Sequence, residues 1–227
     1  MRLIVNRIIT IDLEGDGLDK SINQSIFPNG CHLDPNTRIW CCTVTWNHGV
    51  SETHVCKLPS KERAVINEEG KVVCFTKAVH HNSTVIPQTI WANGVKHQIS
   101  PFNDYKFFIH SIWLMINQIA SSEDKLYAKG YGKYNYDKLL LEIILKKFGY
   151  WLPDWWDRVW VNAGEDKLVN KLWKETPSQI HSGTYIPNQQ YMNYGIQHNI
   201  VDSEQLFDVV MKVRQTHEME EAIKRDF

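Results

Sequence analysis

The sequence predicts an α/β fold in which helices flank a mixed sheet. Residues 3–13, 38–46 and 50–58 are rich in β-branched and apolar side chains, which indicates three strands early in the chain. After residue 102, segments with helical apolar spacing alternate with short strand-like segments. This order of elements is typical of a mixed α/β sheet. The 227 residues, of which 43% are hydrophobic, fit one domain with a sizeable core.

The first three strands are predicted to form an antiparallel meander. The strand over residues 3–13 ends in an acidic, glycine-containing loop at 14–19. A short Asn-His-Gly turn at 47–49 joins the strand at 38–46 directly to the strand at 50–58. Because so short a turn can join only antiparallel neighbours, these two strands should pair side by side.

Residues 59–101 are interpreted as an insertion of hairpins and loops within a single domain that spans residues 1–227. Residues 71–76 and 89–91 have the composition of short strands, and the Ala-Asn-Gly sequence at 92–94 is typical of a turn. The sequence indicates no function for this insertion.

The second half of the chain is predicted to alternate helices with strands. Helical spacing covers 103–120, 136–148 and 165–173, and strand composition covers 125–129 and 159–161. Residues 174–197 look loop-like, with a short helix near 189–194, and a long terminal helix is expected from 202 to about 225.

The charge balance excludes a protein that holds nucleic acid by bulk positive charge. The chain has 25 Lys and Arg against 26 Asp and Glu, so any nucleic-acid contact must come from a local patch or from bound metal ions. Its five cysteines form no CxxC motif, and no segment is apolar enough to be a signal peptide or a membrane span. We therefore expect a soluble, cytoplasmic protein with no membrane partner.

Two carboxylates stand at the carboxyl end of the first predicted strand. Side chains alternate along a strand, so Asp12 and Glu14 project from the same face and Leu13 from the other. Two neighbouring carboxylates repel each other unless they are solvated or share a cation, and hard oxygen ligands suit Mg²⁺ or Mn²⁺. The pair therefore indicates either a metal site or an exposed acidic turn.

Two further acidic positions occur at helix ends. Asp137 follows a glycine turn and falls in the first turn of the helix predicted at 136–148. A carboxylate at this place also interacts favourably with the helix dipole. His198 precedes Asp202 by four residues. If the terminal helix begins before His198, the two share a face; if it begins at Asp202, the aspartate is its N-cap.

In chain order, these elements resemble the three exonuclease motifs of the DEDD (DnaQ-like) superfamily of 3′–5′ exonucleases, which have the RNase H-like fold. The similarity covers residues 8 to about 215, and it is carried by Asp12-Leu13-Glu14-Gly15, by the glycine turn before Asn135-Tyr136-Asp137, and by His198 with Asp202. The chain looks most like the compact, stand-alone enzymes of phages and bacteria, which implies the host cytoplasm if it is phage-encoded. The fold implied is an antiparallel meander continued by parallel strands.

The resemblance implies two-metal hydrolysis of phosphodiester bonds. Asp12 would bridge two Mg²⁺ or Mn²⁺ ions about 4 Å apart. Glu14 and Asp202 would complete the ligands of one ion, and Asp137 would support the other. His198 would be the general base, since an imidazole titrates near pH 6.5.

One departure from the family pattern concerns this base. In the histidine subgroup the His usually precedes the last Asp by five positions, whereas four is the spacing of the tyrosine subgroup. His198 stands at the tyrosine spacing, so either it acts from a shifted backbone position or Tyr194, four residues earlier, takes the role.

The substrate implied is the 3′ end of single-stranded DNA or RNA. Leu13 and Gly15 would contact the terminal nucleotide. Lys133, Tyr134 and Tyr136 belong to a strip of alternating lysines and tyrosines that suits backbone contact and base stacking. The strip contains Lys125, Lys129, Lys133 and Lys138 with Tyr127, Tyr131, Tyr134 and Tyr136.

Three functions stay open at this point. A 3′–5′ exonuclease with a slight preference for DNA is favoured, and a 3′–5′ exoribonuclease is the alternative within the same class. A non-catalytic RNase H-like module that binds nucleic acid or protein is the alternative of another class. The sequence identifies no protein partner.

Overall fold

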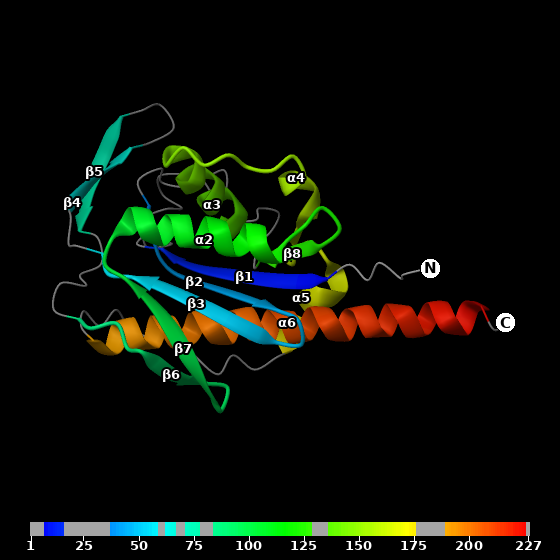
Figure 1. Ribbon diagram of the computed structural model, residues 1–227. Helices are drawn as coiled ribbons and strands as arrows, with labels where there is room; N and C mark the ends of the chain where they lie inside the picture. Colours follow the sequence, from blue (N-terminus) through cyan, green and yellow to red (C-terminus); the bar gives the residue numbers. More distant parts are fainter. Residues whose placement is uncertain are drawn as a thin grey trace.

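Within the described part of the chain, seven strands form one mixed sheet at the centre of the molecule (Figure 1). The computed structural model describes residues 7–15, 37–58, 62–66, 71–77, 84–128, 136–175 and 189–225. The strand order is β6-β7-β3-β2-β1-β8-β9. The strands are β1 (Ile8–Gly15), β2 (Ile39–Trp46), β3 (Val50–Cys56), β6 (Thr89–Ala92), β7 (Val95–Phe102), β8 (Lys125–Ala128) and β9 (Trp160–Asn162).

The predicted antiparallel meander is confirmed. β1 pairs antiparallel with β2, and β2 pairs antiparallel with β3. On the other side of β1, β8 is parallel to β1 and β9 is parallel to β8. β1 therefore lies between an antiparallel and a parallel half: β8 pairs with its residues 8–11, and β2 continues to pair with its carboxyl end at 12–15.

The segment at 59–101 contributes two hairpins of different kinds. β4 (Glu62–Ile66) and β5 (Val72–Lys77) pair only with each other, whereas β6 and β7 extend the main sheet because β7 is parallel to β3. The predicted turn at 92–94 is confirmed, with positive φ angles at Asn93 and Gly94. The sequence did not predict β4 or β7. Pro101 in particular argues against a strand, because proline removes a ladder hydrogen bond.

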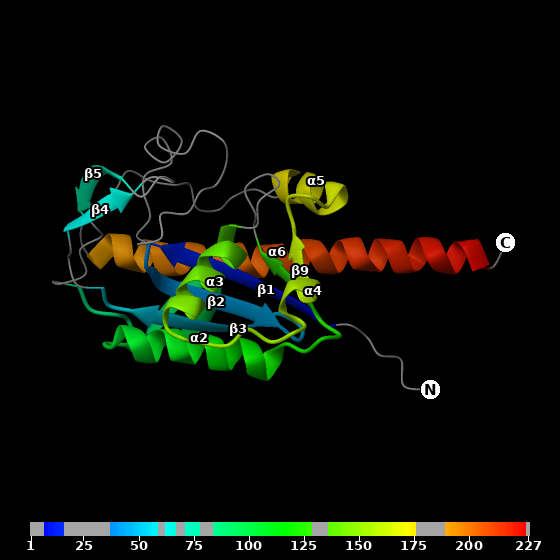
Figure 2. The same ribbon diagram turned by 90° about the horizontal axis from the view of Figure 1, so that it is seen from above.

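Helices cover both faces of the sheet (Figures 1 and 2). α2 and α3 lie on one face, and α6 crosses the other face over β1, β2 and β3 with α5 beside it. The helices are α2 (Tyr105–Ile119), α3 (Tyr136–Lys147), α4 (Trp156–Val159), α5 (Lys167–Glu175) and α6 (Gln189–Arg225). The mixed sheet flanked by helices that the sequence predicts is thus confirmed. No helix in the described ranges is long and apolar enough to cross a membrane.

Local signals explain where α2 begins and where α3 ends. The Asp104 carboxylate accepts a hydrogen bond from the Phe107 amide at 3.0 Å and caps the start of α2. α3 ends at Lys147, and Gly149 follows with a φ of +77°, a conformation that glycine adopts without strain. Both helices begin and end within three residues of the predicted limits.

The prediction for the end of the chain was wrong in one respect. The short helix near 189–194 and the terminal helix from 202 are one continuous helix, α6, of 37 residues. Glycine and asparagine at 193–199 are poor helix formers, so local propensity suggests a break. Packing overrides it, because Gly195 lies so close to Trp40 that an added Cβ would stand 2.6 Å from the indole ring.

The face of the sheet under α6 is polar near its centre. The Thr10 hydroxyl donates to the Ser203 carbonyl at 2.8 Å, and the Ser203 and Thr45 hydroxyls are 2.9 Å apart. These buried hydroxyl groups satisfy one another, which removes most of the cost of burying them. They also fix the register of α6 against β1 and β2.

Candidate active site

The carboxyl end of β1 turns its acidic side chains toward α6. Thr10 contacts α6, so Asp12 and Glu14 project from the same face of the strand. The contact of Asp12 agrees with this, because its Oδ2 accepts a hydrogen bond from Asn199 Nδ2 of α6 at 2.6 Å. The predicted common face of Asp12 and Glu14 follows from the observed strand.

Two buried thiols of β2 report on the charges around this strand end. Burial raises the pKa of the Cys41 thiol well above its ordinary value, and the charges of Glu14 and Asp12 raise it further. Burial also raises the pKa of Cys42, with further contributions from Asp12 and Asp137. Asp12, Glu14 and Asp137 therefore all act on adjacent residues of β2, although Asp137 comes from another element.

α3 brings Asp137 to this region. The aspartate is in the first turn of α3, as predicted, and Leu140 in the following turn packs against β1. A Cβ added at Gly15 would lie 3.6 Å from Leu140 Cδ2 and 3.1 Å from Thr37 Cγ2. The glycine thus allows a close approach between the strand end and α3.

α6 supplies the last aspartate and the candidate base. Because α6 begins at Gln189, His198 and Asp202 share one face, and His198 Nε2 lies 3.7 Å from Asp202 Oδ2. The Tyr194 ring is stacked with the His198 ring, with centroids 6.0 Å apart and planes 14° apart. The His198 side chain is 27% exposed, so part of its ring is accessible to solvent.

Three of the four candidate carboxylates are buried. Asp12, Asp137 and Asp202 are 8%, 5% and 6% exposed. Buried carboxylates are costly unless a positive charge or hydrogen bonds compensate them. In the described ranges, no group of three or more His, Cys, Asp or Glu side chains is arranged so that it could hold a metal ion.

The predicted substrate contacts have different positions. Leu13 is buried in the main core on the side of the sheet opposite Asp12, and Tyr136 is partly buried against the same core. Gly15 ends β1 beside α3. Lys133 and Tyr134 lie outside the described residues. Substrate contact by any of these residues stays a prediction.

Among the described members of the lysine and tyrosine strip, Lys125 and Lys138 both contact α4. Lys138 pairs with Glu142 at 2.8 Å and with Asp157 at 2.6 Å. Lys125 and Tyr127 lie on β8 next to the start of β1, away from its acidic end. Lys125 Nζ donates to the Arg158 carbonyl at 3.4 Å, next to the Asp157 that pairs with Lys138. Substrate contact by the strip stays a prediction.

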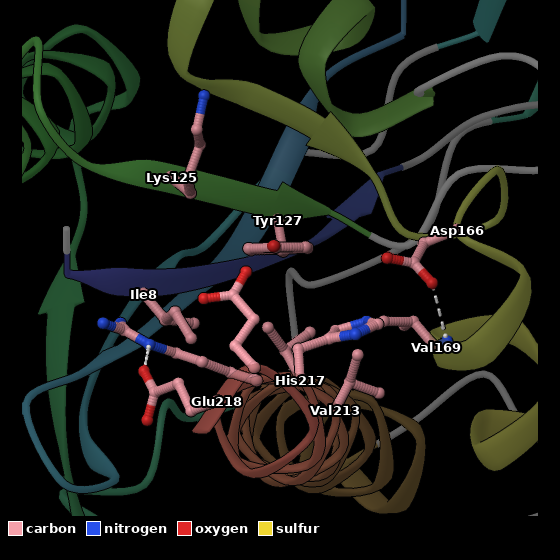
Figure 3. Close-up of a pocket in the computed structure, with 11 residues that line it drawn as sticks. Ile8, Lys125, Tyr127, Asp166, Val169, Val213, His217 and Glu218 are labelled. Carbon is pink, nitrogen blue, oxygen red and sulfur yellow. Dashed lines mark hydrogen bonds and ion pairs between the residues drawn. The ribbon is translucent and has the colours of Figure 1, made fainter. Parts of the chain in front are cut away.

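A pocket of about 400 Å³ lies near the amino end of β1, beside Lys125 and Tyr127. Figure 3 shows Tyr127 of β8 facing Val213 and His217 of α6 across it. Burial raises the pKa of Tyr127, the charge of Asp166 adds to this rise, and Arg214 lowers it. None of the candidate catalytic residues lines this pocket.

Sequence reasoning missed Asn199, which contacts Asp12 directly. It also did not connect Cys41 and Cys42 with the site. The available signal was weak: Asn199 follows the candidate base and precedes Asp202 by three residues, a spacing that places both on neighbouring parts of one helix face.

No protein-family model matches this chain, and no curated protein matches it significantly.

Proposed function

We propose that this chain is a metal-dependent 3′–5′ exonuclease with an RNase H-like fold, acting on the 3′ ends of single-stranded nucleic acid. The observation that carries the proposal is the meeting of β1, α3 and α6 at the carboxyl end of β1. Each brings an aspartate that is buried: Asp12, Asp137 and Asp202. Segments nearly 190 residues apart in sequence are involved, since Asp12 bonds directly to Asn199 of α6.

The topology supports the fold proposed. An antiparallel meander, β1 to β3, is continued by the parallel strands β8 and β9, and helices cover both faces. Fold alone does not define an activity, so the enzyme assignment depends on the carboxylates.

The donor set suits Mg²⁺ or Mn²⁺, both of which prefer carboxylate oxygens. Asp12, Glu14, Asp137 and Asp202 would hold two ions, which would draw these mutually repelling carboxylates toward a common point. When bound, the ions supply positive charge at the phosphate and lower the pKa of the attacking water. They would also provide the charge that a chain with a net charge of −1 lacks.

His198 would accept the proton of the attacking water. It is partly exposed, and the buried Asp202 carboxylate beside it stabilises the imidazolium that forms. Water adds to phosphorus, and the 3′-oxygen of the shortened strand leaves with a proton from solvent. Each cycle would release a nucleoside 5′-monophosphate.

The proposal is tested by a gel time course on 5′-labelled single-stranded DNA and RNA of one sequence, with Mn²⁺, Mg²⁺ or EDTA. We expect a ladder that shortens from the 3′ end with either metal and stops in EDTA. The faster substrate distinguishes a deoxyribonuclease from an exoribonuclease, with DNA expected to be slightly faster.

Asp12→Ala provides the internal control and should leave no ladder while circular dichroism shows a folded chain. If the unaltered, folded protein degrades neither substrate with either metal, the enzyme assignment is wrong. Retention of DNA or RNA in a filter-binding assay under those conditions would then favour the non-catalytic binding module.

A further inference from the structure

Asn199 follows the candidate base on α6, and its side chain contacts two strands of the sheet. Its side chain is fully buried, and its Nδ2 donates to Asp12 Oδ2 at 2.6 Å. On its other side, the Cys41 thiol donates to Asn199 Oδ1 at 3.4 Å. One carboxamide thus joins β2, α6 and β1.

The orientation of this amide follows from its partners. A carboxylate only accepts hydrogen bonds, so the amide nitrogen must face Asp12 and the amide oxygen must face Cys41, whose thiol is a weak donor. The reverse orientation would place two acceptor oxygens against each other. Asp12 can therefore keep this contact only while Asn199 is held in its present rotamer.

A neutral donor has a particular advantage at this place. An arginine or lysine would neutralise the Asp12 carboxylate, whereas an amide orients the carboxylate and leaves its negative charge in place. Groups that orient a metal ligand from behind typically contribute a factor of 10 to 100 in metal affinity.

We propose that Asn199 is a positioning residue whose amide orients the Asp12 carboxylate and so strengthens its binding of the metal ions. This inference depends on the function proposed above. It assigns to Asn199 no contact with substrate or with the reacting atoms. The thiol of Cys41 supports the amide from the opposite side, so its contribution is smaller and indirect.

The test measures Mn²⁺ binding by electron paramagnetic resonance, together with nuclease activity as a function of Mn²⁺ concentration. For Asn199→Ala we expect Mn²⁺ affinity to fall roughly 10- to 100-fold. Activity should be low at limiting Mn²⁺ and should recover when Mn²⁺ is raised by the same factor. A purely structural role would give no such recovery.

The matched control is Gln197→Ala on the same helix. The Gln197 side chain donates to the Trp91 carbonyl, away from Asp12, so this variant should bind Mn²⁺ like the unaltered chain. A second pair guards against an unfolded Asn199→Ala. Cys41→Ser keeps a donor to the amide and should keep the affinity, whereas Cys41→Val removes it and should weaken binding by less than about tenfold.

Each outcome decides the inference. If the unaltered chain binds Mn²⁺ and degrades substrate but folded Asn199→Ala binds Mn²⁺ equally well, Asn199 does not position the ligand while the proposed function stands. If Asn199→Ala does not fold, equal affinities of Cys41→Ser and Cys41→Val overturn the inference. If the unaltered chain itself binds no Mn²⁺, the proposed function fails and the role of Asn199 fails with it.

Discussion

The two parts of α6 differ in their surroundings. Residues 189–213, here the packed segment, cross the sheet and carry the buried residues Asn199, Asp202 and Ser203. Residues 214–225, here the distal segment, extend beyond the sheet (Figures 1 and 2), and positions 215–221 are all exposed. One helix thus serves as a wall of the candidate site and as a solvent-exposed rod.

The difference shows where the helix obtains its stability. In the packed segment, Gly195 contacts Trp40 and Ser203 bonds to both Thr10 and Thr45. In the distal segment, the contacts that the structure gives include hydrogen bonds and ion pairs within the helix, such as Arg214 with Glu218 at 2.8 Å. Exposed pairs of this kind contribute only about 0.3–0.5 kcal/mol each. Substitutions in the packed segment should therefore affect both the stability of the fold and the activity. Substitutions in the distal segment should change neither.

The largest expected effect is on catalysis. Asp202→Ala should abolish hydrolysis without unfolding the chain, because the aspartate is a proposed metal ligand. Glu218→Ala, an acidic substitution in the distal segment, should leave the rate unchanged. Initial rates on 5′-labelled single-stranded DNA measure both. Full activity of Asp202→Ala would remove it from the metal site.

His198→Ala should reduce kcat by roughly 10²- to 10⁴-fold if the imidazole is the base. The acidic limb of the pH–rate profile should disappear with it, because that limb reports protonation of the base. Tyr194→Phe is the comparison variant. The Tyr194 ring is stacked with His198, and phenylalanine keeps that ring but removes the hydroxyl group that could act as the base. A large loss in Tyr194→Phe with only a few-fold loss in His198→Ala would move the role to the tyrosine.

Gly195→Ala should destabilise the protein by about 1–3 kcal/mol, although alanine is the better helix former. The reason is contact, because the added methyl group would stand 2.6 Å from the Trp40 ring. Gln215→Ala in the distal segment should change the free energy of unfolding by less than about 0.5 kcal/mol. Urea denaturation followed by circular dichroism compares the two. Equal stabilities would show that the indole ring can move aside.

The smallest expected effect concerns pH and lies outside both segments of α6. Burial alone would raise the pKa of Asp124, but hydrogen bonds from Arg7 and Ser121 outweigh it and hold the pKa below the ordinary value of 3.8. Asp124 therefore stabilises the fold above that pH, and this stabilisation is lost as the pH falls through its lowered pKa.

Asp124→Asn should lower the melting temperature at pH 7 by a few degrees. The gap between the variant and the unaltered chain should narrow as the pH falls below 3.8 and through the lowered pKa of Asp124, because the aspartate becomes protonated. Thermal melts across this range provide the measurement. A gap that stays the same from pH 7 down to the acid unfolding of the chain would show that the Asp124 charge does not stabilise the fold.

Much of the fold could be predicted because its signals are local. The three strands of the meander, α2 and α3 follow from composition, from the Asn-His-Gly and Gly149 turns, and from the Asp104 cap. β7 could not be predicted, since Pro101 and several polar residues argue against a strand until β3 and β6 provide partners on both sides. Likewise, the continuity of α6 through Gly195 could not be predicted, because it depends on packing against Trp40 of another element.

The sequence by itself determined that Asp12 and Glu14 share a face of β1 and that Asp137 lies in the first turn of a helix, because strand alternation and helix-start signals are properties of neighbouring residues. Only the tertiary structure decided that Asn199 bonds to Asp12, across 187 positions of the chain. That contact depends on how α6 is set against the sheet. The close contact of Gly195 with Trp40 and the hydroxyl groups of Thr10, Thr45 and Ser203 fix that setting, and no local pattern contains this information.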